Sequence, residues 1–219
     1  MTYHSKGGKA RAAKLTPEER SAAARTAAAT RWANRPSFEH RANPINLTAT
    51  VKFLNGLHAR GVIGKYVLIG GIAAMAYSEP RMTKDIDAVV HIDDTFKEYP
   101  SMWTKVLAEA GGAHTPGGFT ILVGPDKTPL DLSATGGDKL MEECLEKAVA
   151  MNVDGEIAWI APPEYLVLMS LNAFRPEVDY GRITALYPQC ANKVRRLLKR
   201  FDHEGKLLRN LERLLDLNA

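Results

Sequence analysis

Two short apolar runs in the first half of the chain predict buried β-strands. One covers residues 66–69 and stops at Gly70-Gly71, and the other covers residues 85–90. Apolar residues at helical spacing predict helices before, between and after these strands, over about 47–60, 72–76 and 94–110.

The second half continues the alternation and then becomes helical. Strands over 119–123 and 129–133 are expected to form a hairpin, followed by a helix over 137–150 and a strand over 157–160. From Pro162 onward the pattern predicts helices over about 163–173, 179–187, 190–201 and 204–217. This order predicts an α/β (α+β) fold, with a small mixed β-sheet flanked by helices and a helical C-terminal region.

The N-terminal residues have a different texture. Residues 1–15 are rich in Gly, Ala and Lys/Arg and predict an arm, and Thr16 begins an alanine-rich helix that runs to about Trp32. Prolines then mark a linker. We therefore expect three parts: a basic arm, helix and linker over 1–45, a core over 46–161, and the helical region over 162–219.

Composition excludes several classes of protein. A chain of 219 residues and 24.1 kDa suits one domain, and it has no run of 18 apolar residues, so membrane spans are not expected. The basic N-terminus leads into no apolar segment, which argues against a secretory signal. The two cysteines, Cys144 and Cys190, lie far apart. Neither a disulfide framework nor a zinc module is expected, and the sequence predicts a cytoplasmic protein.

Charge is unevenly distributed along the chain. Net charge is +6 over residues 1–43, −6 over 44–189 and +4 over 190–219. Two basic ends around an acidic middle indicate a polyanionic partner such as RNA, bound from the sides. Ordinary solvated helices at both ends would give the same pattern, so both interpretations remain open.

Three aspartates are the candidate chemical groups. Asp85 and Asp87 project from the same face of the second strand, and Asp131 lies between leucines in a later strand. Neighbouring carboxylates repel each other unless a cation lies between them, and hard divalent cations prefer such oxygen ligands. Alternatively the three are turn and surface residues. Upstream, Gly70 and Gly71 join a strand to a helix, where glycine allows a close approach to phosphate but is also required by a tight turn.

Together, these residues resemble the signature of the DNA polymerase β-like nucleotidyltransferase superfamily. The segment from Arg81 through Thr83 and Lys84 to the acid pair is most similar to AbiEii/MenT-type toxins of type IV toxin–antitoxin systems. The resemblance covers about residues 50–190.

The resemblance implies a role for each matching residue. Asp85, Asp87 and Asp131 would be catalytic and bind Mg²⁺, in a two-metal site, with Asp131 helping to activate the attacking hydroxyl. Gly70 and Gly71 would hold the phosphates of a nucleoside triphosphate, and Arg81, Thr83 and Lys84 would contact the triphosphate. The pattern departs from the family at Ser170, where relatives often have lysine, and the usual basic–acidic motif is blurred, with Arg175, Asp179 and Arg182 as the nearest candidates.

The function expected from this sequence is magnesium-dependent transfer of a nucleotide to an acceptor hydroxyl, on a tRNA 3′ end or a protein. The chain would then be a toxin, with a cognate antitoxin as a partner. Two alternatives remain: a non-catalytic nucleic-acid-binding regulator, and an enzyme that nucleotidylates a small molecule of the aminoglycoside type. The basic arm and the basic residues over 193–200 favour RNA as the partner, since phosphate contacts come from Lys/Arg clusters, and they are equally consistent with the acidic surface of a protein partner.

Overall fold

The computed structural model describes residue 16 and residues 45–79, 83–92, 95–114 and 120–216. The arm, helix and linker predicted over 1–45 lie almost entirely outside these residues. The described elements, in chain order, are α3 (Leu47–Ala59), β1 (Tyr66–Ile69), α4 (Gly70–Ala74), β2 (Ile86–Val90), α5 (Thr95–Glu109), β3 (Thr120–Val123), β4 (Thr128–Ala134), α6 (Lys139–Glu146), β5 (Val149–Val153), β6 (Glu156–Ile160), α7 (Pro163–Ala173), α8 (Pro176–Phe201) and α9 (Lys206–Asp216).

The strands form one mixed six-stranded sheet in the order β3-β4-β2-β1-β6-β5. β1 pairs with β6 and β2 pairs with β4 in parallel, whereas the other neighbours are antiparallel. Because β1 and β2 are antiparallel, the C-terminal end of β1 lies beside the N-terminal end of β2. The start of β4 is at the same end of the sheet.

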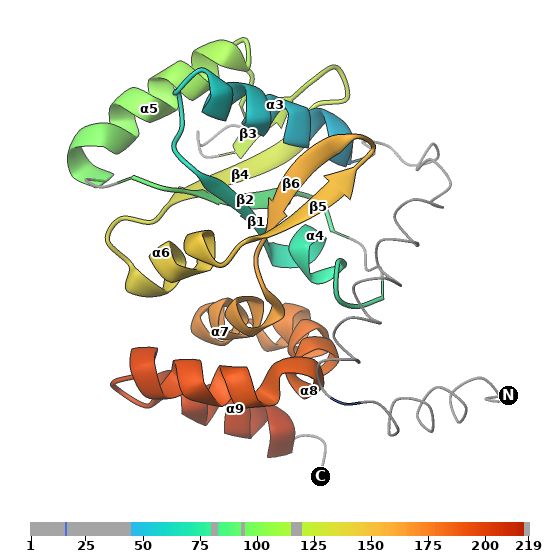
Figure 1. Cartoon of the computed structure of the whole chain (residues 1–219), viewed down its shortest axis with the longest axis vertical. Helices are drawn as coiled ribbons and strands as arrows, with labels where there is room; N and C mark the ends of the chain where they lie inside the picture. Colours follow the sequence, from blue (N-terminus) through green and yellow to red (C-terminus); the bar gives the residue numbers. More distant parts are fainter. Residues whose placement is uncertain (1–15, 17–44, 80–82, 93–94, 115–119, 217–219) are drawn as a thin grey trace, which may run out of the picture.

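Helices cover both faces of this sheet (Figure 1). α3 and α5 lie on one face, and α4 and α6 lie on the other, with α7 packed against α4 and with α8 and α9 packed against α7. Fully buried leucine and isoleucine side chains from the strands and from α3 and α7 form the core, among them Leu54, Leu68, Ile86, Leu130, Ile160 and Leu168. The predicted α/β fold with a mixed sheet is confirmed.

One predicted element is wrong. The helix expected over 137–150 ends at Glu146, and residues Val149–Val153 form strand β5, which the sequence pattern did not predict. Val149 and Ala150 extend an apolar helical pattern in the sequence, but in the fold β5 pairs with β6 along its whole length. Pairing with a neighbouring strand, which the local periodicity of the sequence does not reveal, makes this segment a strand and not a helix.

The two helices predicted over 179–187 and 190–201 are joined in the structure. α8 runs from Pro176 to Phe201 with non-helical backbone angles at Cys190, two residues after Pro188. Proline removes a helical hydrogen bond and kinks a helix without necessarily ending it. Within the described residues, no helix has the length and apolar character needed to cross a membrane.

Candidate active site

The three aspartates converge at the end of the sheet where β1 stops and β2 and β4 begin. Asp87 is the cross-strand partner of Ile69 on one side and of Asp131 on the other. Paired residues on neighbouring strands lie about 5 Å apart and share a face. Asp85 comes two residues before Asp87, so the structure brings all three predicted carboxylates to the same end of the strands.

Burial separates the two faces of these strands. Ile86 and Leu130 are fully buried, whereas Asp87 and Asp131, one position further along, are half-buried. Among the described residues, none donates a hydrogen bond to the Asp87 carboxylate, although Thr120 Oγ1 donates one to Asp131 Oδ1 at 2.5 Å. Asp87 therefore contributes carboxylate oxygens that the described residues leave available.

The pKa of Asp87 reflects its burial and its closeness to the other two carboxylates. Burial, and then the charges of Asp85 and Asp131, raise the pKa of Asp87 to about 6, while the charges of Arg182 and Arg175 lower it. An acid with a raised pKa beside like charges is typical of a functional site. The charges of Asp85 and Asp131 therefore oppose the ionisation of Asp87.

The two glycines make room for neighbouring side chains. A Cβ added at Gly70, where φ is +64°, would lie 1.9 Å from Asp87 Oδ2, and one at Gly71 would lie 3.0 Å from Thr83 Oγ1. The absence of side chains here therefore allows Asp87 and Thr83 to sit against the start of α4. The contact of Gly70 and Gly71 with nucleotide phosphates stays a prediction.

The residues preceding the acid pair have different environments. Thr83 Oγ1 lies 3.1 Å from the backbone oxygen of Asp85 and 3.2 Å from Asp85 Oδ1, so it holds the turn before β2. Lys84 is exposed beside this turn. Arg81 lies outside the described residues. Contact of these three residues with a triphosphate remains an expectation.

A group at the start of α8, outside the predicted set of site residues, faces the acidic edge. Asp179 is 1% exposed, and its Oδ2 accepts hydrogen bonds from the backbone N–H and Nε of Arg175 at 3.2 and 3.3 Å. Arg182 Nη1 lies 3.3 Å from Asp179 Oδ1, as an ion pair without hydrogen-bond geometry, and donates to Ser170 Oγ at 3.3 Å.

This group places two positive charges close enough to Asp87 to affect its pKa. In the sequence, the three residues stand out only as remnants of a blurred motif, because their spacing within one helix is common. The buried carboxylate that orients both guanidinium groups is visible only in the fold. Arg175 and Arg182 supply the cationic side of the candidate site.

A divalent cation is the group that three neighbouring carboxylates predict. Hard oxygen donors and the repulsion at Asp87 fit Mg²⁺ in ligand type. As the side chains stand in the described part of the chain, however, no three His, Cys, Asp or Glu residues form a ready set of metal ligands. Instead, one carboxylate oxygen of Asp85 and one of Asp131 each accept a hydrogen bond from a threonine hydroxyl. The magnesium site therefore remains a prediction.

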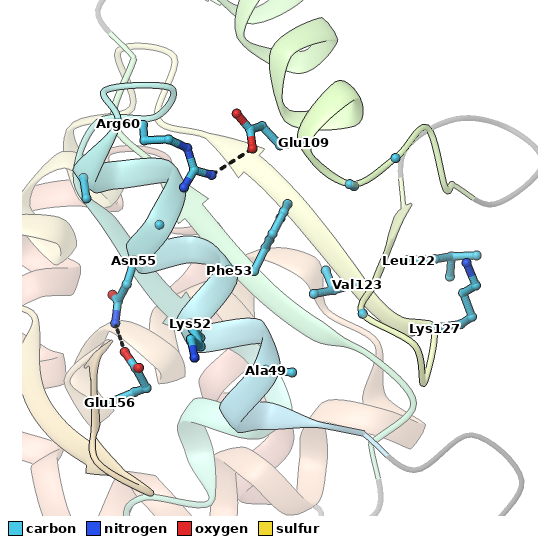
Figure 2. A pocket seen from close by; sticks show the side chains of 15 residues that line it. Ala49, Lys52, Phe53, Asn55, Arg60, Glu109, Leu122, Val123, Lys127 and Glu156 are labelled. Carbon is cyan, nitrogen blue, oxygen red and sulfur yellow. Dashed lines mark hydrogen bonds and ion pairs between the residues drawn. The ribbon is translucent and has the colours of Figure 1, made fainter.

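An open cavity of about 880 Å³ lies elsewhere, beside α3 (Figure 2). Its walls include an ion pair of 2.9 Å between Arg60 and Glu109 and a hydrogen bond of 3.0 Å from Asn55 Nδ2 to Glu156. None of the predicted site residues that the structure describes lines it. The cavity is thus separate from the candidate site.

Comparisons with known proteins address the fold. No family model matches the chain, and no curated protein matches it. A solved structure of an antigenic nucleotidyltransferase-like protein from Paracoccidioides brasiliensis is similar, with a TM-score of 0.50 and 18% identity, over 75% of this chain and 94% of that chain. At this identity the likeness supports the nucleotidyltransferase-like fold alone, and membership of the AbiEii/MenT-type toxins stays a prediction.

Proposed function

We propose that this chain is a magnesium-dependent nucleotidyltransferase: an acceptor hydroxyl attacks the α-phosphate of a nucleoside triphosphate, the bond between the α- and β-phosphates breaks, and the nucleoside monophosphate is transferred with release of pyrophosphate. The observation that carries the proposal is the register Asp87↔Asp131, which sets two carboxylates side by side next to Asp85 on a nucleotidyltransferase-like fold. Two carboxylates on adjacent strands, beside a glycine turn, are suited to a polyphosphate with bound cations.

Each group has a proposed task. Bound Mg²⁺ would supply charge stabilisation at the transferring phosphate, held by Asp85, Asp87 and Asp131. Asp131 would take the proton of the attacking hydroxyl. Arg175 and Arg182 would bind triphosphate oxygens, because guanidinium groups match phosphate geometry.

RNA is the acceptor that the surface charge favours. On the second half of α8, Arg195, Arg196 and Lys199 are exposed, and no ion pair engages them within the described residues. By contrast, Lys193 and Arg200 pair with Glu164 and Glu143 at 2.9 and 2.5 Å. These three cations, which have no ion-pair partner in the part of the chain that the structure describes, would bind phosphates of a tRNA or another RNA.

The direct test is transfer of label from each nucleoside triphosphate, with Mg²⁺, to total tRNA and to cellular protein. We expect label in an RNA band with the wild type and none with Asp85→Ala/Asp87→Ala. Glu98→Gln, an exposed change on α5, serves as the matched control and should retain transfer. Absence of label with all triphosphates, together with salt-sensitive DNA binding and no nucleotide binding by calorimetry, would instead support a regulator.

Toxicity tests the biological role proposed for the enzyme. We expect induced expression of the wild type in a bacterial host to arrest growth, because modification of tRNA would stop translation. The double variant Asp85→Ala/Asp87→Ala should permit growth at equal protein abundance, measured by immunoblot. Equal growth with the wild type and with the double variant, at equal protein abundance, would contradict a catalytic toxin. The transfer assay would then decide whether the protein is an enzyme.

Asp179→Asn is expected to weaken triphosphate binding more than the chemical step. The change removes the buried charge that orients both arginines, so we expect KM for the triphosphate to rise at least about tenfold, with a smaller fall in kcat. The unfolding free energy should fall by about 1–3 kcal/mol, because two guanidinium groups lose their partner. Steady-state kinetics and chemical denaturation measure the two effects.

Arginine variants separate positioning from simple loss of stability. Arg182→Lys keeps the charge near Asp87 and should raise KM less than Arg182→Gln. Arg209→Gln, on the exposed surface of α9, is the matched control and should leave KM unchanged. Equal KM values for all of these variants would remove the proposed role of the α8 arginines.

A further inference from the structure

Thr120 stands at one end of a row of residues that crosses the sheet through the candidate site. Strand register pairs Thr120 of β3 with Asp131 of β4, Asp131 with Asp87 of β2, and Asp87 with Ile69 of β1. Directly paired residues share a face of a sheet. Thr120 therefore lies on the same face as both acids, and Asp131 lies between Thr120 and Asp87.

The hydroxyl of Thr120 holds one oxygen of the Asp131 carboxylate. Oγ1 of Thr120 donates to Oδ1 of Asp131 at 2.5 Å, a distance typical of a hydroxyl bonded to an ionised carboxylate. Within the described residues, this carboxylate is the one hydrogen-bond partner of the hydroxyl, and Oδ2 of Asp131 has no partner. The contact thus fixes Oδ1 and leaves Oδ2 for a ligand.

The packing of β3 does not depend on this hydroxyl. The side chains of Ile121 and Val123 are buried in the core, whereas Thr120 is half-buried. Four consecutive residues of β3 pair with β4, which sets the register of the two strands. A β-branched side chain has few rotamers in a strand, so little rotamer freedom is lost when the hydroxyl bonds to Asp131. The contact therefore orients a carboxylate of the candidate site on a strand that is already fixed.

Thr83 makes a weaker contact on the other side of the site. Its Oγ1 lies 3.1 Å from the backbone oxygen of Asp85 and 3.2 Å from Asp85 Oδ1, so its one proton is shared between the turn and the carboxylate. The proton of Thr120 is shared with no second acceptor among the described residues. Asp131 is therefore the acid that a neighbouring side chain orients most directly.

We propose that Thr120 is the positioning residue of Asp131. Its hydroxyl holds Oδ1, so that Oδ2 remains for the bound cation and for the proton of the attacking hydroxyl. Carboxylates that bind a metal are commonly held by such a hydrogen bond, and its loss typically costs about 10–100-fold in metal affinity or activity. The inference rests on the proposed function, because that function gives Asp131 its task.

Three variants test the role of the hydroxyl through metal binding alone. Thr120→Val keeps the shape of the side chain and removes the donor, whereas Thr120→Ser keeps the donor. Thr104→Val, at an exposed position of α5, removes a hydroxyl that bonds to the backbone oxygen of Pro100, and it is the matched control. The probe is Mn²⁺ without nucleotide, since Mn²⁺ takes the same carboxylate ligands as Mg²⁺, and electron paramagnetic resonance measures the free ion.

We expect Thr120→Val to bind Mn²⁺ at least about tenfold more weakly than the wild type. Thr120→Ser should stay within about twofold of the wild type, and Thr104→Val should be unchanged. In an Asp131→Asn background, Thr120→Val should have no further effect, because the hydroxyl acts through that carboxylate. A merely structural role would not produce this dependence on Asp131.

Steady-state kinetics separate positioning from binding of the triphosphate. With saturating Mg²⁺ we expect kcat of Thr120→Val to fall about 10–100-fold, and KM for the triphosphate to change less than about twofold. The reason is that the hydroxyl contacts Asp131 and not the arginines of α8. Chemical denaturation should give similar unfolding for all three variants.

Two results would overturn the role of Thr120 and leave the proposed function standing. One is unchanged Mn²⁺ affinity and kcat in Thr120→Val, while Asp85→Ala/Asp87→Ala is inactive. The other is an equal loss in Thr120→Val and Thr120→Ser, which would show that the hydroxyl is not the group that matters. A wild type that neither binds Mn²⁺ nor transfers a nucleotide would instead contradict the proposed function, and the role of Thr120 with it.

Discussion

Asp87→Asn is expected to abolish nucleotidyl transfer and, at the same time, to make the metal-free protein more stable. Activity should fall by at least about 10³-fold, because the variant loses a central ligand charge for the cations of the reaction. Stability should rise because the carboxylate is partly buried, is not hydrogen-bonded by the described residues and is repelled by Asp85 and Asp131. An amide of the same shape removes this repulsion.

The expected gain in stability depends on pH. The pKa of Asp87 is about 6 in the folded protein against 3.8 for an ordinary aspartate, so ionisation of Asp87 opposes folding at neutral pH. At pH 7.5 the variant should be more stable by about 1–3 kcal/mol, and this advantage should fade as pH falls through about 6 toward 4. Thermal unfolding across this range measures the difference between variant and wild type.

Magnesium provides the internal control for this prediction. Addition of Mg²⁺ should raise the melting temperature of the wild type by relieving the repulsion, and should have little effect on Asp87→Asn. A variant that is less stable than the wild type at pH 7.5, or that keeps its transfer activity, would contradict the role assigned to Asp87.

Gly70→Ala is expected to cost about 2–4 kcal/mol of stability and at least about 100-fold in transfer activity. Two physical effects add at this position. A positive φ of +64° is unfavourable for alanine, and the new Cβ would meet Asp87 Oδ2 at 1.9 Å and Asp87 Cβ at 3.1 Å. Since the Cβ of Asp87 is fixed to β2, rotation of the carboxylate cannot relieve the whole clash.

Gly61→Ala separates these two effects. Gly61 has nearly the same φ, +67°, but nothing lies within 4 Å of an added Cβ. We therefore expect Gly61→Ala to cost about 1 kcal/mol, the backbone contribution alone, without loss of transfer activity. Gly70→Ala should also cost less in an Asp87→Ala background than in the wild type. Equal costs at both glycines, measured by chemical denaturation, would show that the contact with Asp87 is not limiting.

Most of the sheet was predictable from the sequence, and one strand was not. β1 and β2 are short apolar runs with clear stops, so their strand character is local. β5 has no such signal, because its residues extend the apolar pattern of α6 and become a strand only by pairing with β6. Strand order is likewise non-local, since β4 joins β2 from more than forty residues along the chain.

The candidate site divides in the same way. Strand alternation and glycine conformation are local properties, so the amino-acid pattern alone predicts that Asp85 and Asp87 share one face of a strand and that a glycine pair forms the preceding turn. By contrast, the position of Asp131 next to Asp87, and of Arg175 and Arg182 near it, depends on how distant segments pair and pack. Sheet register and helix packing join residues far apart in the chain, and no local pattern encodes that distance.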